Sequence, residues 1–439
     1  MGWSGTTDPS PRCCFPSPTS REPTGTRVLL TDSDQAMLQG EAGGAARLAM
    51  ELLVATAKAE AASELLDISA AHIDGCLYHG QAGLDFARLL VEGGATVSVP
   101  TTLNVSSLDL LHPQLYRGDP AVATAARELM DAYAAMGCVP SWTCAPYQLP
   151  GRPGFGDQVA WGESNAIVFA NSVLGARTGR YGDFLDICCA LTGRAPATGL
   201  HTDQGRRATL RVDLDIPDHM LDDDLLYPVL GHLLGEVSGV AVPVVVGLDA
   251  RATEDRLKAL GAAAASSGAV AMFHAVGVTP EAPTLDAATG GKEPETQLVI
   301  GLTELSRARG SFNQGAGPLG AVSVGTPHFS VSEMEQLAGL VSGRTTGVPF
   351  YVNTSRDVLA QAEQSGAVAV IERFGATIVT DTCTYITPIM EEVRGVVMTN
   401  SGKWAFYAPG NLGVEVAFAG LEACVLSAMS GEVTLGEEW

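Results

Sequence analysis

The chain has 439 residues, a formal net charge of −23 at pH 7 and a hydrophobic content of 46%. A chain of this length can enclose several hydrophobic cores, so we expect two or more domains. The acidic surplus excludes nucleic acid as a partner, because a phosphate backbone requires a basic surface, and it also disfavours an anionic membrane surface. No apolar run approaches the length of a membrane span.

The chain begins with a stretch that is rich in Pro, Ser and Thr and lacks the apolar segment of a secretory signal. This composition is typical of disorder, so residues 1–30 are interpreted as a disordered extension. The whole chain contains nine cysteines with no regular spacing. Without an export signal, such cysteines are expected to be reduced thiols, which predicts a cytoplasmic protein.

Strand and helix signals alternate through the first ordered region, residues 31–226. Runs rich in Ala, Leu and Met predict helices over residues 34–62 with a break at 43–44, 82–92 and 120–136. Apolar or alternating runs predict strands over residues 66–73, 95–99 and 209–216. Asn104 lies in the loop after the second of these strands, where open α/β sheets bind ligands, so we expect it to line a site.

The second region, residues 227–439, repeats the same rhythm of strand and helix. Apolar runs such as VPVVVGL and VPFYVN precede helices expected over residues 254–265, 330–341, 355–365 and 421–429. This alternation is typical of mainly parallel sheets covered by helices on both faces. We therefore predict an α/β fold with two or more α/β subdomains.

One stretch, residues 161–196, concentrates polar side chains in apolar surroundings. Burying polar groups without partners costs about 1–3 kcal/mol each, so these groups must satisfy one another or face a ligand. We interpret the stretch as the floor of an active site. Its polar residues include Glu163, Asn165, Asn171, Ser172, Arg177, Arg180 and Asp183.

Five further candidate side chains lie outside this stretch. Cys144 and Cys383 each lie in a loop beside small polar residues, which suits a metal ligand, although a single buried free cysteine is most often a small hydrophobic residue. His328 in GTPHFS could be a general acid or base, or a structural histidine. Ser401 and Lys403 follow a strand in TNSGKWAFY, where they form either a carboxylate or phosphate site or an ordinary capped turn.

Nucleotide signatures are not supported. The GxGxxG match at residues 315–320 precedes a strand instead of following one, and it contains Pro318, so we interpret it as a turn. The sequence has no GxxxxGK[ST] phosphate loop. A nicotinamide-dependent reductase, which the α/β rhythm would allow, is therefore disfavoured.

Several strings occur in an order that resembles one protein family. They are MLQGEAGGAARLAMELL, YHGQAGLDFA, VPTTLNVSSLDLLHP, TCAPY, WGESNAIVFANSVLGARTGRYGDFLDICCALTGRAP, GTPHFS, DTCTYITPI and TNSGKWAFYAPGNLGVEVAF. Together, over residues 36–431, they resemble the large subunit of aconitase X. The resemblance implies an aconitase-like α/β fold, an iron-dependent hydro-lyase activity, and a partner in the form of a separate small swivelling-domain subunit.

The resemblance also implies a cofactor, either an iron–sulfur cluster of the [2Fe–2S] type or iron. Cys144 in TCAPY and Cys383 in DTCTY match cluster-ligand positions, and Cys188 in the DIC string is expected to be the third ligand. Thr326 stands in GTPHFS where the archaeal pattern has Cys, which favours the bacterial substrate, cis-3-hydroxy-L-proline.

Within this family, roles can be assigned to the candidate residues. Arg177 and Lys403 are expected to hold the substrate carboxylate, because a cation fixes its orientation. For Arg177, the alternative is a salt bridge to Glu163 or Asp183. The predicted catalytic residues are Glu163, Ser172, Lys403 and His328. The predicted substrate-binding residues are Asn104, Asn165, Asn171, Arg177 and Ser401.

The expected reaction is dehydration of cis-3-hydroxy-L-proline, a small hydroxy acid, to pyrroline-2-carboxylate, with iron as a Lewis acid on the hydroxyl. The general base is expected in this chain or in the small subunit. Two alternatives stay open: the large subunit of a mevalonate 5-phosphate dehydratase, and a non-catalytic subunit that binds a small acid.

Overall fold

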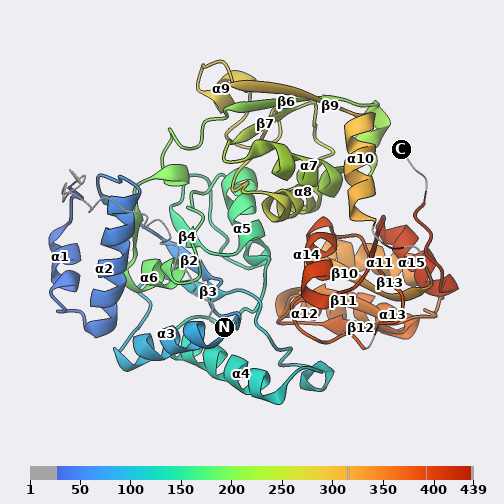
Figure 1. Ribbon diagram of the computed structural model, residues 1–439, viewed down its shortest axis with the longest axis horizontal. Helices are drawn as coiled ribbons and strands as arrows, with labels where there is room; N and C mark the ends of the chain where they lie inside the picture. Colours follow the sequence, from blue (N-terminus) through green and yellow to red (C-terminus); the bar gives the residue numbers. More distant parts are fainter. Residues whose placement is uncertain (1–26, 314, 316, 392, 437–439) are drawn as a thin grey trace, which may run out of the picture.

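Consecutive segments of the chain build three units, each around a parallel sheet (Figure 1). The structure, a computed structural model, describes residues 27–313, 315, 317–391 and 393–436. In Figure 1 the first unit lies on the left in blue to green, the second at the top, and the third at the lower right in orange to red. Within the described residues, no helix is long and apolar enough to cross a membrane.

The first unit contains the sheet β3-β2-β4, whose strands are all parallel, and a separate antiparallel pair, β1-β5. Helices pack apolar side chains such as Leu53, Leu84 and Leu129 into its core. The elements are α1 (Asp32–Leu38), α2 (Gly44–Ala59), β1 (Leu65–Asp67), β2 (Ala70–Ile73), α3 (Gln81–Glu92), β3 (Thr101–Leu103), α4 (Pro120–Ala135), β4 (Val159–Trp161), α5 (Ser164–Phe169), α6 (Leu185–Thr192) and β5 (Arg194–Pro196).

The second unit contains the parallel sheet β8-β7-β6-β9. Its helices α7 and α8 approach closely at Gly231, where a Cβ atom would lie 2.0 Å from the Leu260 carbonyl oxygen, so only glycine fits there. The elements are β6 (Leu210–Asp215), α7 (Leu226–Ser238), β7 (Pro243–Val246), α8 (Glu254–Ser267), β8 (His274–Ala275), α9 (Leu285–Thr289), β9 (Thr296–Gly301) and α10 (Leu302–Phe312).

The third unit contains the five-stranded parallel sheet β12-β11-β10-β13-β14. Its strands read as apolar runs because helices cover both faces. The elements are β10 (Leu319–Phe329), α11 (Val331–Val341), β11 (Phe350–Thr354), α12 (Arg356–Ser365), α13 (Ala367–Phe374), β12 (Ala376–Val379), β13 (Val396–Thr399), α14 (Gly402–Leu412), β14 (Val416–Phe418) and α15 (Leu421–Ser430).

The predicted α/β fold of mainly parallel sheets is confirmed, with corrections in detail. Residues 95–99 form no strand; the strand in this part of the chain is β3, just after Pro100. The single strand expected over residues 66–73 is two strands, β1 and β2, that belong to different sheets. The boundary expected at 226/227 falls inside the second unit, because β6 precedes it and pairs with β7 and β9.

The expected extension ends earlier than residue 30. Val28 is buried, and the Leu29 N–H donates to the Ser63 carbonyl oxygen at 2.7 Å, so residues 27–30 belong to the first unit. Residues 1–26, on which the rest of that prediction falls, lie outside the described residues.

Candidate active site

A cavity of about 570 Å³ opens between the first and third units. Its walls come from loops at the carboxyl ends of parallel strands: Asp74 follows β2, Asn104 follows β3 and Glu163 follows β4. From the third unit, Tyr385 lies in the loop after β12 and Lys403 lies after β13. Open α/β sheets bind ligands at this edge, and here two such edges face the same space. This cavity is therefore the candidate active site.

Lys403 and Glu163 form a buried ion pair between the two units, and each side chain is only 4% exposed. Ser401 caps α14 by accepting the Trp404 N–H at 3.0 Å, which places Lys403 in the first turn of the helix. Glu163 caps α5 in the same way, accepting the Ala166 N–H at 2.7 Å. Two helix caps thus fix the two charges on opposite sides of the junction.

Both members of this pair stay charged at neutral pH. Burial by itself favours the neutral form of Glu163, but the charge and hydrogen bonds of Lys403 outweigh it and lower the pKa of Glu163. Burial also disfavours the Lys403 ammonium, yet the Glu163 carboxylate raises the pKa of Lys403 well above its ordinary value. The cavity wall therefore presents a fixed ammonium and a fixed carboxylate.

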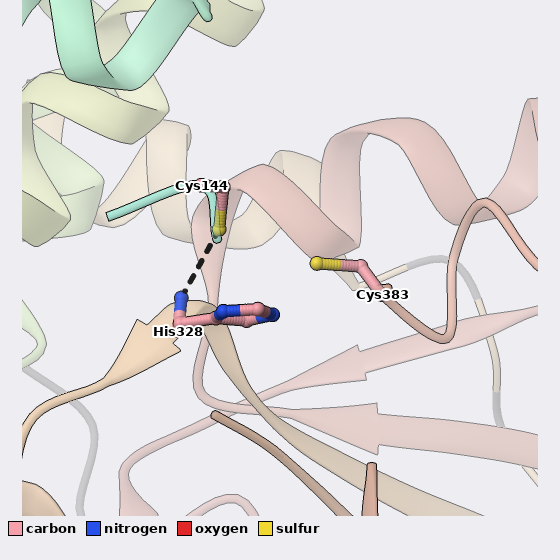
Figure 2. Close-up of side chains that lie close together, drawn as sticks. All are labelled: Cys144, His328 and Cys383. Atoms are coloured by element: carbon pink, nitrogen blue, oxygen red, sulfur yellow. Dashed lines mark hydrogen bonds between the residues drawn. The ribbon is translucent and has the colours of Figure 1, made fainter. Parts of the chain in front are cut away.

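Next to the ion pair lies a second group, Cys144, His328 and Cys383, shown in Figure 2. One ligand atom from each residue lies within 4.8 Å of those of the other two. The backbone N–H of His328 donates to Cys144 Sγ at 3.3 Å. The His328 ring is hydrogen-bonded on both sides: Nδ1 is paired with the Thr143 hydroxyl and Nε2 with the Thr382 carbonyl oxygen, each at 3.1 Å. His328 could bind a metal only by giving up one of these bonds.

The environment shifts the pKa values of the two thiols, Cys144 and Cys383, in opposite directions. Burial opposes ionisation of Cys144, but the hydrogen bond from Cys383, together with the charges of His328 and Lys403, lowers the pKa of Cys144 to about 6. The pKa of Cys383 is raised well above its ordinary value, because its thiol donates that hydrogen bond and is buried. Cys144 is thus the thiol of the two that ionises more readily, and the thiolate is the form that binds metals.

This donor set fits a transition metal. Two thiols and an imidazole suit iron, zinc or an iron–sulfur centre better than a hard cation such as Mg²⁺. All three side chains are buried, and the Cys144 side of the group opens to the cavity. Three protein donors would leave a coordination position for a ligand.

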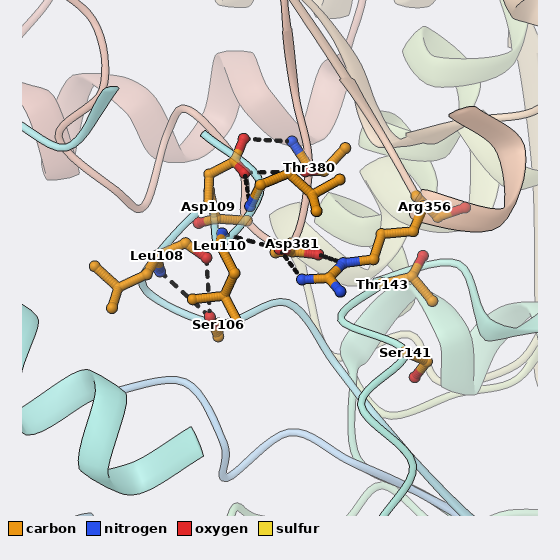
Figure 3. A network of polar contacts seen from close by, with 12 residues as sticks. Ser106, Leu108, Asp109, Leu110, Ser141, Thr143, Arg356, Thr380 and Asp381 are labelled. Atoms are coloured by element: carbon orange, nitrogen blue, oxygen red, sulfur yellow. Dashed lines mark hydrogen bonds and ion pairs between the residues drawn. The ribbon is translucent and has the colours of Figure 1, made fainter. Parts of the chain in front are cut away.

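A polar network fixes the loop that carries Cys383 against the first unit (Figure 3). Asp381 has φ +61°, a left-handed conformation that is uncommon outside glycine. Arg356 holds it with two hydrogen bonds of 2.6 Å. From the first unit, Asp109 accepts the N–H and the hydroxyl of Thr380 at 2.9 and 3.0 Å. The network therefore sets the position of Cys383 relative to Cys144.

Asn165 connects the ion pair to the thiol group. Its Nδ2 atom donates to Glu163 Oε2 at 2.7 Å and to the Cys144 carbonyl oxygen at 2.6 Å. Its Oδ1 atom accepts the Tyr147 hydroxyl at 2.9 Å. Every polar atom of the Asn165 side chain is thus engaged, and the residue lies behind the cavity wall.

Asp74 and Asn104 form another polar pair on the wall. Asn104 Nδ2 donates to Asp74 Oδ1. Burial raises the pKa of Asp74 to about 7, and the negative charges of Glu163 and Asp183 contribute in the same direction. The sequence had singled out Asn104 but not Asp74. Asp74 directly follows the strand expected to end at residue 73, so the rule that found Asn104 also applies to it.

Other predicted site residues lie away from the cavity lining. Residues 170–174 continue α5 as one turn of π-helix. Asn171 Nδ2 donates to the Thr178 and Ala271 carbonyl oxygens, and Ser172 Oγ accepts the Phe273 N–H at 2.8 Å. These two side chains thus connect the first unit to the second, and their polar atoms are occupied by protein partners.

Arg177, expected to hold the substrate carboxylate, does not line the cavity either. Its guanidinium lies 2.5 Å from the carboxylate of the exposed Asp203 and donates to the His201 carbonyl oxygen at 3.4 Å. Of the two cations considered for that role, the structure brings only Lys403 to the cavity.

Cys188, expected as the third metal ligand, lies in α6 inside the core of the first unit, with Leu53 and Ile187. The structure does not bring it to the group formed by Cys144 and Cys383. Burial raises the pKa of Cys188 to about 12, with the Asp186 charge acting in the same direction, so it remains a neutral thiol. The third position in the group belongs to His328, which the sequence suggested for proton transfer.

Comparisons with known proteins place this fold and site in one class. The chain matches the domain families Aconitase X first domain at residues 27–204, second domain at 208–310 and third domain at 319–430. These segments coincide with the three units of the structure. The chain belongs to the aconitase X family.

Several relatives of known name are similar over most of the chain. It is 47% identical to a cis-3-hydroxy-L-proline dehydratase of Pseudomonas aeruginosa and 44% identical to one of Hypocrea jecorina, covering 92% and 93% of this chain and 70% of each relative. It is 37% identical to the phosphomevalonate dehydratase large subunit of Thermococcus kodakarensis, over 87% of this chain and 95% of that one. A crystal structure of Thermococcus kodakaraensis aconitase X in its holo-form superposes with a TM-score of 0.83 at 35% identity, over 91% of this chain and 100% of that chain.

Proposed function

We propose that this protein is a hydro-lyase that dehydrates cis-3-hydroxy-L-proline to pyrroline-2-carboxylate. The observation that carries the proposal is the identity of 44–47% to relatives named for this activity, over more than nine-tenths of the chain. The cavity supports it, because a fixed ammonium and a metal-binding group lie at one wall.

In this reaction a base takes the proton from C2, next to the carboxylate, and the hydroxyl leaves from C3. The electrons of the broken C–H bond form a C2=C3 double bond, and proton and hydroxyl together make one water. The resulting enamine tautomerises to the cyclic imine. Negative charge therefore develops next to the substrate carboxylate, where a fixed cation stabilises it.

Lys403 is proposed to bind that carboxylate. It is the one lysine or arginine among the residues that line the cavity, and Glu163 holds its ammonium in place. Because the ion pair is formed before substrate arrives, Lys403 needs no reorganisation during the reaction.

Cys144 and Cys383, with His328, are proposed to hold the iron–sulfur centre or iron. Such a centre, when bound, supplies Lewis-acid assistance to departure of the hydroxyl. We propose a [2Fe–2S] cluster as its form. A cluster of this type usually has four protein ligands, so three donors would leave a position for the substrate hydroxyl.

The cavity favours the imino acid over a phosphorylated substrate. Among the described residues that line it, those with a formal charge are Asp74, Glu163 and Lys403, and no arginine is present. Glu163 offsets the ammonium, and Asp74, whose pKa is raised to about 7, adds negative charge as it ionises. A phosphate monoester that also carries a carboxylate would add about three negative charges to this wall, whereas cis-3-hydroxy-L-proline adds none overall.

A small module is proposed to cover the cavity and to contribute the general base. Archaeal relatives are named as large subunits, and the relatives from Pseudomonas and Hypocrea are longer than their match to this chain. The part of this chain that lines the cavity offers His79 and Asp74 as the alternatives for proton transfer.

The test is to purify the protein anaerobically together with its small module, to measure iron and sulfide, and to supply each substrate. We expect formation of pyrroline-2-carboxylate from cis-3-hydroxy-L-proline and no turnover of mevalonate 5-phosphate. The opposite preference would overturn the substrate assignment. Absence of iron and of both activities would instead support a non-catalytic subunit that binds a small acid.

A further inference from the structure

The ring nitrogen of the proposed substrate is a secondary ammonium at neutral pH, and the Lys403–Glu163 pair does not serve it. We propose that Asp74 and Asn104 bind this ammonium and thereby select cyclic imino acids over hydroxy acids without nitrogen. The inference rests on the proposed function, because it concerns the substrate of that same cavity.

Two hydrogen-bond acceptors on the cavity wall, Asp74 Oδ2 and Asn104 Oδ1, have no donor in the described part of the chain. Asp74 Oδ1 accepts from Asn104 Nδ2, but within the described part of the chain no group donates to Asp74 Oδ2. Asn104 Oδ1 is buried and also has no hydrogen-bond partner. Asn104 is only 2% exposed, and an unpaired amide oxygen in such a position is unfavourable unless a ligand or water satisfies it.

The number of free acceptors matches the ligand. A secondary ammonium has two N–H donors, and Asp74 Oδ2 with Asn104 Oδ1 provides one acceptor for each. A primary ammonium would leave one of its three donors unpaired at this pair, and a carbocycle would leave both acceptors unpaired. Unpaired buried polar groups reject a ligand more strongly than a change in shape does.

The charges on the cavity wall also favour binding of the ammonium at Asp74 and Asn104. The other carboxylate on the wall, Glu163, already accepts from Lys403, Asn165, the Ala166 N–H and the Ser164 hydroxyl. Among the described residues, no cation donates to Asp74, and the one side-chain donor to it is the neutral Asn104. A ligand cation at Asp74 would therefore compensate the one carboxylate of the wall that no protein cation pairs with directly.

The backbone of this loop is held in place for such a role. The Asp74 N–H donates to Asp186 Oδ2 at 2.6 Å, and the Asn104 N–H donates to the Ile73 carbonyl oxygen at 2.9 Å. The two side chains thus leave neighbouring parallel strands, β2 and β3, from fixed backbone positions. A preorganised pair loses little conformational freedom when a ligand binds.

The experiment measures binding without turnover, by calorimetry on the intact protein with its small module. The two probes are L-proline and cyclopentanecarboxylate, which differ in the ring nitrogen. In Asp74→Asn we expect L-proline to bind at least about thirtyfold more weakly, with cyclopentanecarboxylate bound at least as tightly as in the wild type, because the variant also removes a negative charge that repels this anion. Asn104→Ser should weaken L-proline about three- to tenfold with the same selectivity.

The matched control is Asp183→Asn, which removes a negative charge near Asp74 from a residue outside the cavity lining. It should retain the preference for L-proline to within about threefold. Equal losses for both probes in Asp74→Asn, or unchanged binding of L-proline, would overturn the inference. If Asp74→Asn does not fold, Asn104→Ser decides the question by the same criterion.

Failure of the proposed function gives a different result. If the protein does not dehydrate cis-3-hydroxy-L-proline but loses L-proline selectively in Asp74→Asn, the ammonium site stands and the reaction is wrong. If the protein turns over this substrate and Asp74→Asn keeps the wild-type preference, the reaction stands and the ammonium site is wrong.

Discussion

Lys403 of the third unit and Glu163 of the first form an ion pair that is almost completely buried. The two residues are 240 positions apart in the chain, and each lies at the start of a helix that follows a strand of a different parallel sheet. This contact joins the halves of the cavity and gives it its one fixed ammonium.

Replacing Lys403 with Met should reduce both stability and activity. The substitution leaves the Glu163 carboxylate buried without a countercharge, so the free energy of unfolding should fall by about 3–5 kcal/mol. Dehydration should slow by at least about a hundredfold, because the cation beside the developing charge is lost. Denaturant unfolding and steady-state kinetics measure the two effects.

The control is the double variant Lys403→Met with Glu163→Gln. Removing both charges should restore much of the stability and none of the activity. If the two single losses of stability simply add in the double variant, the ion pair does not couple the two units.

Cys144→Ser and Cys383→Ser should each remove most of the bound iron. A thiolate is the stronger ligand for iron, and the remaining donors are too few to hold it. Cys188→Ser is the matched control, since Cys188 packs in the core of the first unit. Metal analysis and the visible absorption spectrum check the result, and loss of iron in Cys188→Ser to the same extent would return that residue to the ligand set.

Arg177→Ala should change kcat/KM by less than about threefold. The side chain lies away from the cavity and pairs with Asp203, whose side chain is 79% exposed. Such an exposed ion pair contributes about 0–1 kcal/mol to folding stability, so its loss should disturb the active site little. Steady-state kinetics with Lys403→Met as the comparison test this prediction. A loss for Arg177→Ala as large as that for Lys403→Met would mean that the arginine reaches the substrate.

Asp74 should make the folded protein less stable as pH rises from about 4 to about 7. Burial and the charges of Glu163 and Asp183 raise the pKa of Asp74 to about 7 from an ordinary value of 3.8. The folded state therefore holds a proton that the unfolded state has lost, and stability decreases with pH over this window. Asp74→Asn should remove that decrease, so relative to wild type it should be up to about 4 kcal/mol more favourable at pH 8 than at pH 4, as measured by denaturant unfolding at the two pH values.

The Glu163 carboxylate should act in the opposite direction at acid pH. Its pKa is lowered in the folded state, so its contribution is present above the ordinary value of about 4.5 and is lost as pH falls through the lowered pKa. Glu163→Gln should flatten the acid side of a stability profile measured by thermal unfolding. A steeper acid side in this variant would contradict the assigned direction.

Local sequence signals were enough to predict the fold class and much of the cavity wall. The strand and helix rhythm predicted the α/β architecture because apolar runs and turn residues act over short distances. Asn104 and Lys403 were found because each follows a strand, and Glu163 was found because it belongs to a polar stretch in apolar surroundings; each signal needs only neighbours in the chain to be recognised.

Tertiary structure decided which of the candidates meet. Asn171, Ser172 and Arg177 share a polar stretch with Glu163, but a turn of π-helix and the contact with the second unit direct them elsewhere. Cys188 lies in a sequence motif that suggested a metal ligand, yet its side chain is enclosed in the core of the first unit. His328 joins Cys144 and Cys383 because β10 ends between their two loops, and no spacing along the chain encodes that distance. Chemistry at a single position can be recognised from the sequence, whereas convergence of distant positions depends on how the units pack.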